Sequence, residues 1–150
     1  MSHPPAFKYA RRLAGAFPIR WDQPRPNCRP IFETLSDRET VQSALEEAFA
    51  SPSPPTAILA QSDRIALLAL DWLKEKGLSV PADVSVVGFD GVPESATSTP
   101  PLTTIRQPIA EIGRRAVLAI LNHSGGTRRE RIDTELVVRG STAPPRDRED

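Results

Sequence analysis

The stretch VSVVGFDG, residues 84–91, decides the fold. Its apolar residues are Val84, Val86, Val87 and, near its end, Phe89, and such a run is typical of a strand covered on both faces of its sheet. The run then stops on a carboxylate, Asp90, followed by Gly91. We therefore expect a buried strand that delivers an acidic side chain at its carboxyl end.

Outward from this strand, extended and helical patterns alternate along the chain. Extended segments are predicted at residues 31–35, 56–60, 84–89, 102–105 and 134–140. Helices are predicted at residues 6–16, behind a Ser-x-x-Glu capping box at 36–39, at 64–76 and at 109–122. This alternation predicts an open, mostly parallel α/β sheet.

The helix at 64–76 has clear boundaries in the sequence. Asp63 is predicted to cap its start, and Gly77 is predicted to end it. Trp72 falls on the apolar stripe of this helix, so we expect it in the core. Leu67 and Leu70 lie off that stripe.

Polar residues follow two of the predicted parallel strands. Ligands of open α/β sheets bind beyond the carboxyl ends of the strands. Asp90 follows one strand, and Ser62 and Asp63 follow another. A carboxylate accepts two hydroxyl hydrogen bonds at once, which suits a sugar or a nucleoside. The alternatives are a simple Asp-Gly turn for Asp90 and a helix cap for Asp63.

Composition argues against several classes of protein. Lys and Arg total 19, as do Asp and Glu, and zero net charge argues against a nucleic-acid surface. No apolar run approaches the roughly 18 residues of a membrane span. The single cysteine, Cys28, is compatible with a cytoplasmic protein. His3 and His123 have no neighbours at ligand spacing, so we expect neither a metal nor another cofactor.

Several motifs resemble those of one family. They are GLSVPADVSVVGFD (77–90), PPLTTIRQP (100–108), ELVVRGST (135–142) and, upstream, RRLAG (11–15). The first three resemble the effector-binding core of lactose/galactose-repressor-type transcription regulators, over about residues 36–143, and RRLAG resembles the arginine-containing helix start of the same family. The resemblance implies a doubly wound sheet of the type I periplasmic-binding-protein kind.

The resemblance also implies a division of the chain. Residues 1–143 would be a partial effector-binding and dimerisation domain, truncated at its N-terminus. Its helix 109–122 would belong to a second subdomain that these residues lack, as they also lack a helix-turn-helix headpiece. Residues 144–150 are charged and are expected to form a disordered tail.

Site residues follow from the same resemblance. Asp90 resembles the aspartate that contacts the effector, and Ser62 stands where the family has a ligand-binding asparagine. The full predicted ligand-binding set is Asp90, Ser62, Asp63, Arg12, Gln107 and Ile109. A two-fold dimer interface is predicted to contain Leu67, Leu70, Val41 and Leu45.

The leading functional hypothesis is the effector-sensing part of a transcriptional repressor. Its partners would be a sugar, polyol or nucleoside, a second copy of the chain, and operator DNA through a headpiece outside this chain. The alternative is a fragment of a periplasmic-type sugar-binding protein, which normally lacks PPLTTIRQP and carries a secretion signal. An enzyme fits worst, because there is no phosphate loop, no G-x-S-x-G and no histidine placed as a base.

Overall fold

The computed structural model describes residues 32–34, 36–122, 125 and 129–144. The predicted helix at 6–16, with Arg12, lies outside the described residues, as do Cys28 and both histidines. So does the predicted tail beyond Pro144.

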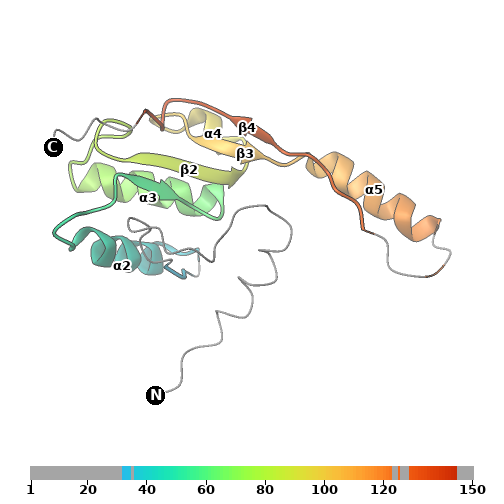
Figure 1. Cartoon of the computed structure of the whole chain (residues 1–150), viewed down its shortest axis with the longest axis horizontal. Coiled ribbons are helices and arrows are strands. Elements are labelled where there is room, and N and C mark those ends of the chain that lie inside the picture. The colour runs from blue at the N-terminus through green and yellow to red at the C-terminus, as the bar shows by residue number, and fades with distance from the viewer. Residues whose placement is uncertain (1–31, 35, 123–124, 126–128, 145–150) are drawn as a thin grey trace, which may run out of the picture. The chain divides into compact units, whose positions relative to one another are not determined.

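An open four-stranded sheet forms the centre of the described part (Figure 1). Its strands are β1 (Ala57–Leu59), β2 (Ser85–Asp90), β3 (Thr103–Arg106) and β4 (Glu135–Val137), in that order across the sheet. The β1–β2 and β2–β3 pairs are parallel, and the β3–β4 pair is antiparallel. The open, mostly parallel sheet is therefore confirmed. Residues 32–34 contain no strand, so the prediction at 31–35 is wrong for its described part.

Four helices lie in the described part of the chain. They are α2 (Arg38–Phe49), α3 (Asp63–Glu75), α4 (Glu94–Thr97) and α5 (Ile109–Leu121). The short α4 was not predicted, because its four residues are too few to show a period.

Both predicted N-caps are off by one residue. Asp37, not Ser36, caps α2, and its carboxylate accepts a hydrogen bond from the Thr40 amide at 2.9 Å. This bond, the largest cause, lowers the pKa of Asp37. Ser62, not Asp63, caps α3, because Ser62 has the extended backbone of a cap and its Oγ accepts from an amide one turn on.

The core lies where α3 packs against the sheet and α2 packs against α3 (Figure 1). Its buried apolar residues are Val41, Leu45, Ala60, Ile65, Ala66, Ala69, Leu70, Trp72, Leu73, Val84, Val86 and Leu102. The core position of Trp72 is confirmed, and its ring lies 5.3 Å from that of Phe49 on α2.

Three of the four predicted interface residues belong to this core. Val41 and Leu45 are buried on α2 against α3, and Leu70 is 5% exposed. They are not available to a partner subunit, so their assignment to the interface is wrong. For Leu70 the physical reason is that it lies beside Leu78, Val80 and Pro100, from the segments after α3 and before β3, which widens the buried face of α3 beyond a single stripe. Leu67 is half-buried and packs against the core.

The ELVVRGST segment is fastened to the sheet by buried polar groups. Arg139 donates to the Leu102 carbonyl at 2.6 Å and to Ser95 Oγ at 3.1 Å. Ser141 is fully buried, and its hydroxyl donates to the Val86 carbonyl at 2.6 Å. These bonds satisfy the carbonyls of Leu102 and Val86, which burial would otherwise leave unpaired.

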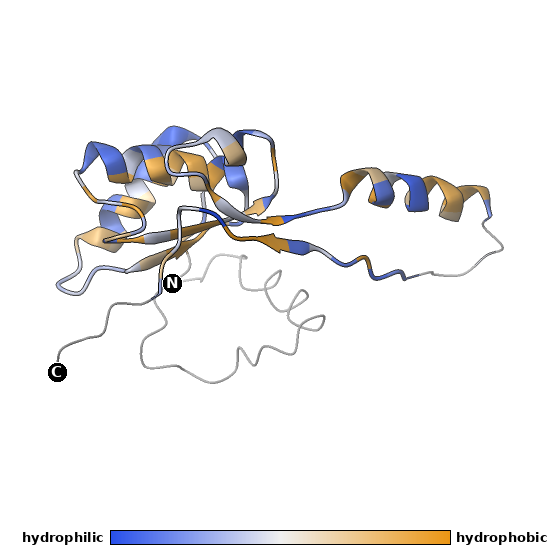
Figure 2. Ribbon diagram, turned by 90° about the horizontal axis from the view of Figure 1, so that it is seen from above, coloured by the Kyte–Doolittle hydropathy of each residue, from blue (hydrophilic) through white to orange (hydrophobic). Residues whose placement is uncertain are grey.

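Helix α5 contrasts with the core helices, because none of its residues is buried. Hydrophobic residues occur along its length (Figure 2), and Ile109, Ile120 and Leu121 are 62%, 74% and 74% exposed. Among the described helices, none is long and apolar enough to cross a membrane.

Candidate functional site

The three parallel strands end at one edge of the sheet. Ser62 follows β1, Asp90 is the last residue of β2, and Gln107 follows β3. The sheet therefore brings two of the predicted site residues, Asp90 and Gln107, into direct contact. Such an edge is where open α/β sheets bind ligands.

Asp90 and Gln107 are joined by two hydrogen bonds. The Gln107 side chain donates through Nε2 to Asp90 Oδ1 at 2.8 Å, and the Gln107 amide donates to the Asp90 carbonyl at 3.1 Å. Both side chains are half-buried. Among described residues nothing donates to Asp90 Oδ2, so this oxygen and Gln107 Oε1 remain as acceptors for hydroxyl groups.

The backbone of Asp90 adopts a conformation that side chains rarely take. Its φ is 121°, and Gly91 behind it has a φ of 78°. A Cβ on Gly91 would lie 2.8 Å from the Arg106 Cα, so only glycine fits there. The chain thus turns sharply at the strand end, which explains the Asp-Gly pair and leaves the carboxylate beside Gln107.

Ser62 is placed by helix formation. Its Oγ accepts from the Ile65 amide at 3.3 Å, and the residue is half-buried. A hydroxyl that accepts a capping bond still has its own proton to donate. Ser62 can therefore cap α3 and offer a donor at the same edge.

Asp63 differs from the other predicted site residues, because it is fully buried. Its Oδ2 accepts from the amides of Gly91 and Val92 at 2.9 and 2.8 Å, and its Oδ1 accepts from Thr104 Oγ1. It neither caps α3 nor has surface to offer a ligand. We therefore withdraw it from the ligand-contacting set.

One residue in the sequence, Gly88, indicates this burial of Asp63. Gly88 interrupts the valine run of β2, and a Cβ there would overlap Asp63 Oδ1. A glycine inside a buried strand indicates that another group approaches the backbone closely. Here that group is the Asp63 carboxylate.

Ile109 begins α5 directly beyond Gln107, and its amide donates to the Gln107 carbonyl at 2.9 Å. Its side chain is 62% exposed and makes no part of the Asp90–Gln107 pair. Arg12 lies outside the described residues.

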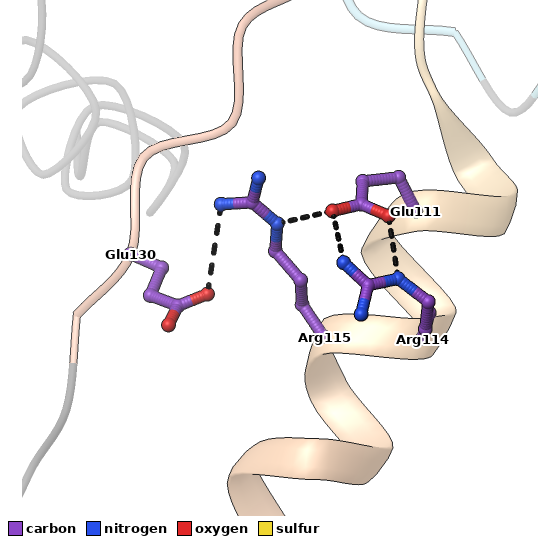
Figure 3. A network of polar contacts seen from close by, with 4 residues as sticks. All are labelled: Glu111, Arg114, Arg115 and Glu130. Atoms are coloured by element: carbon purple, nitrogen blue, oxygen red, sulfur yellow. Dashed lines mark hydrogen bonds and ion pairs between the residues drawn. The ribbon is translucent and has the colours of Figure 1, made fainter.

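A separate charged network lies on α5 (Figure 3). Glu111 accepts hydrogen bonds from Arg114 at 2.7 and 2.8 Å and from Arg115 at 2.6 Å, and Arg115 also pairs with Glu130 at 4.0 Å. The bonds from Arg114, then those from Arg115, lower the pKa of Glu111 to about 2. Arg114 and Arg115 line a hollow of about 270 Å³ on α5, away from the strand edge. Because the arginines are already paired with carboxylates, this network organises the helix surface rather than a ligand site.

No group of three or more possible metal ligands occurs among the described residues. The polar groups at the strand edge are the Ser62 hydroxyl, the Gln107 amide and the Asp90 carboxylate, one oxygen of which accepts no hydrogen bond from the described residues. That set suits a neutral, hydroxyl-bearing ligand.

Comparison with known proteins agrees with this geometry. A family model described as a periplasmic binding protein-like domain matches residues 6–142. The chain belongs to this family. Within it, the chain corresponds to part of the effector-binding region of LacI-family transcription regulators, as the sequence motifs predicted.

Relatives of this periplasmic-binding-protein-like chain include characterised regulators. The HTH-type transcriptional repressor CytR of Escherichia coli K12 is 44% identical over 109 residues, 69% of this chain and 32% of that protein. A LacI family regulator from Enterococcus faecalis V583, solved with bound ribose, is 30% identical with a TM-score of 0.66, over 76% of this chain and 43% of that chain. The lac repressor dimer, solved bound to operator, is 32% identical with a TM-score of 0.62, over 69% and 37%. The chain thus spans about a third of the length of the curated repressor.

Proposed function

We propose that this chain is the effector-sensing portion of a transcriptional repressor and binds a small polyhydroxylated ligand at the Asp90 edge of its sheet. The ligand class is a sugar, a related polyol or a nucleoside. The Asp90–Gln107 pair is the observation that carries the proposal. It leaves two acceptor oxygens without a donor among the described residues, Asp90 Oδ2 and Gln107 Oε1, at the strand ends.

Adjacent hydroxyl groups match this pair. Two neighbouring hydroxyls of a sugar ring can donate to the two oxygens, and the hydroxyl of Ser62 adds a donor. A hydrogen bond to a charged acceptor contributes about 1.5–3 kcal/mol, so Asp90 is expected to supply most of the affinity at this edge. The bound ribose of the Enterococcus faecalis regulator supports this ligand class. Arg12 and Ile109 remain proposed contacts of the ligand.

The assembly of the whole protein is part of the same proposal. We propose a homodimer, for which Leu67 is the remaining interface residue of the original four, and operator contact through a headpiece outside these 150 residues. The segment around α5 would pack against a second subdomain, so that ligand closes two subdomains and shifts the dimer between two states. Because its relatives are transcription regulators, we propose a cytoplasmic, non-enzymatic role over a periplasmic-type binding protein.

Ligand titration followed by nuclear magnetic resonance (NMR) tests the ligand proposal, because it detects weak binding to one wall of a cleft. Ribose, adenosine and glucose are added to the labelled chain, with glycerol as a control. We expect one of the three to shift the signals of Asp90, Gly91 and Gln107 with a dissociation constant on the order of millimolar, about −4 kcal/mol. Asp90→Ala should abolish those shifts. The absence of any localised shift, or shifts unaffected by Asp90→Ala, would contradict the proposal.

A further inference from the structure

We propose that the buried Asp63 is a positioning residue, which holds Asp90 in its ligand-binding conformation without touching the ligand. The expected effect on ligand binding rests on the proposed function, whereas the effect on the conformation of Asp90 does not depend on it. Asp63 begins α3, directly after the cap Ser62, and reaches under the end of β2.

The bonds of Asp63 fix the residues that follow Asp90. Its Oδ2 accepts from the amides of both Gly91 and Val92, at 2.9 and 2.8 Å. Its Oδ1 accepts from Thr104 Oγ1 on the neighbouring strand. One buried side chain therefore ties together the start of α3, the loop after β2 and the strand β3.

This tie is needed because Asp90 is strained. A φ of 121° is unfavourable for a residue with a Cβ, and such a conformation persists only where neighbouring groups fix it. Gln107 holds Asp90 itself through its two hydrogen bonds. Asp63 holds the next two amides, so both Asp90 and the residues that follow it are fixed.

The buried carboxyl group of Asp63 suits this task. A hydrogen bond to an ionised acceptor is stronger than one to a neutral acceptor. The carboxylate also lies at the positive N-terminal end of α3, which favours a negative charge there. The loop amides are thereby held more firmly than a neutral side chain would hold them.

Two matched variants of the full chain separate positioning from stability. Asp63→Ala removes the acceptor for the loop, and Asp63→Asn keeps the shape with a weaker, neutral acceptor. Thr104→Val is the control, because it removes the bond at Oδ1 and leaves both loop bonds at Oδ2 in place. The first readout is the three-bond coupling between the amide and α protons of Asp90, which is small at a φ of 121° and large in an extended strand.

We expect Asp63→Ala to raise that coupling and to weaken binding of the ribose or adenosine probe about tenfold, equal to about 1.4 kcal/mol. Asp63→Asn should give an intermediate result, which also decides the question if the alanine variant does not fold. Thr104→Val should lower the melting temperature while leaving the coupling unchanged and the affinity within about twofold.

Two outcomes would overturn the inference. In the first, the Asp90 coupling and the amide signals of Gly91 and Val92 stay unchanged in the folded Asp63 variants. The other is a Thr104→Val variant that alters coupling and affinity as much as Asp63→Asn, which would indicate general destabilisation. If the unaltered chain binds none of the probes, the proposed function fails, and the coupling alone still decides whether Asp63 positions Asp90.

Discussion

Gly88→Ala is the change that best tests how the core and the site share space. Gly88 lies in the middle of β2, where an added Cβ would overlap Asp63 Oδ1 and lie 3.0 Å from Leu102 Cδ2 and 3.3 Å from Ala66 Cβ. Leu102 and Ala66 are themselves 0% exposed, so neither has space into which it can move. The variant must therefore displace the carboxylate or push the strand away from α3.

The expected cost follows from this crowding. Adding a methyl group to a well-packed core typically costs about 1–3 kcal/mol. The free energy of unfolding of a small protein falls by about 1–3 kcal/mol per molar urea, so the urea concentration at the unfolding midpoint should fall by roughly 1 M. Equilibrium urea unfolding followed by Trp72 fluorescence measures this, since Trp72 is buried in the same core. Gly113→Ala on α5 is the matched control, because a Cβ there meets nothing within 4 Å.

A double variant identifies the group that is crowded. Asp63→Ser shortens the side chain and makes room at Gly88, so Gly88→Ala should cost at most about half as much in that background. Equal costs in the two backgrounds would show that the carboxylate is not the obstacle. A Gly88→Ala chain as stable as the parent would refute the close approach of Asp63 to β2 altogether.

Three further predictions concern α5 and the dimer. Amide hydrogen exchange should be fast throughout α5, because none of its residues is buried, and a dye that reports exposed apolar surface should bind the chain; slow exchange in α5 would show that the helix is covered in solution. The pKa of Glu111 is lowered from its ordinary 4.5 to about 2, so the stabilisation of α5 by its ion pairs is complete above pH 4.5 and is lost as the pH falls toward 2. Carbon chemical shifts of α5 should show this loss, and Glu111→Gln should remove the pH dependence. Leu67→Glu should shift a dimer toward monomer in sedimentation without unfolding it, whereas Leu70→Glu should unfold the chain because Leu70 is 5% exposed; an unchanged mass for a dimeric Leu67→Glu protein would count against the interface.

The sheet and its site edge were predictable from the sequence because both depend on local patterns. The apolar run predicted the strand β2, although its residues alternate between buried and half-buried, so only one face is fully covered, and the chain turns where Asp90 meets Gly91. The Asp90–Gln107 contact was less evident, since it arises from the parallel register that sets Asp90 opposite Arg106. Two separate motifs predicted the two strands, and the register itself required the structure.

The errors have a common physical cause, which is that periodicity does not say how many neighbours an element has. Leu70 falls outside a single helical stripe, yet it is 5% exposed, because Leu78, Val80 and Pro100 lie beside it on that side of α3. Aspartate is a common helix cap, yet Ser62 caps α3, and the buried Asp63 instead accepts hydrogen bonds from amides that lie 28 and 29 residues away in the sequence. Such long-range partners leave no local signal beyond the glycine at 88.

The position of the site in the chain suggests how binding could be coupled to the rest of a regulator. The chain leaves the sheet after β3 at Gln107, forms α5, and returns to pair with β3 through β4. Gln107 therefore both contacts Asp90 and begins the segment whose apolar side chains are uncovered. Burying one aliphatic side chain is worth about 1.5–3 kcal/mol, so covering Ile109, Ile120 and Leu121 would release several kcal/mol. We propose that a partner that covers α5 also restricts the direction in which the chain leaves Gln107, and so acts on the pair that we propose to hold the ligand. By reciprocity, a ligand that fixes the pair favours the covered state of α5, which is the coupling a two-state regulator requires.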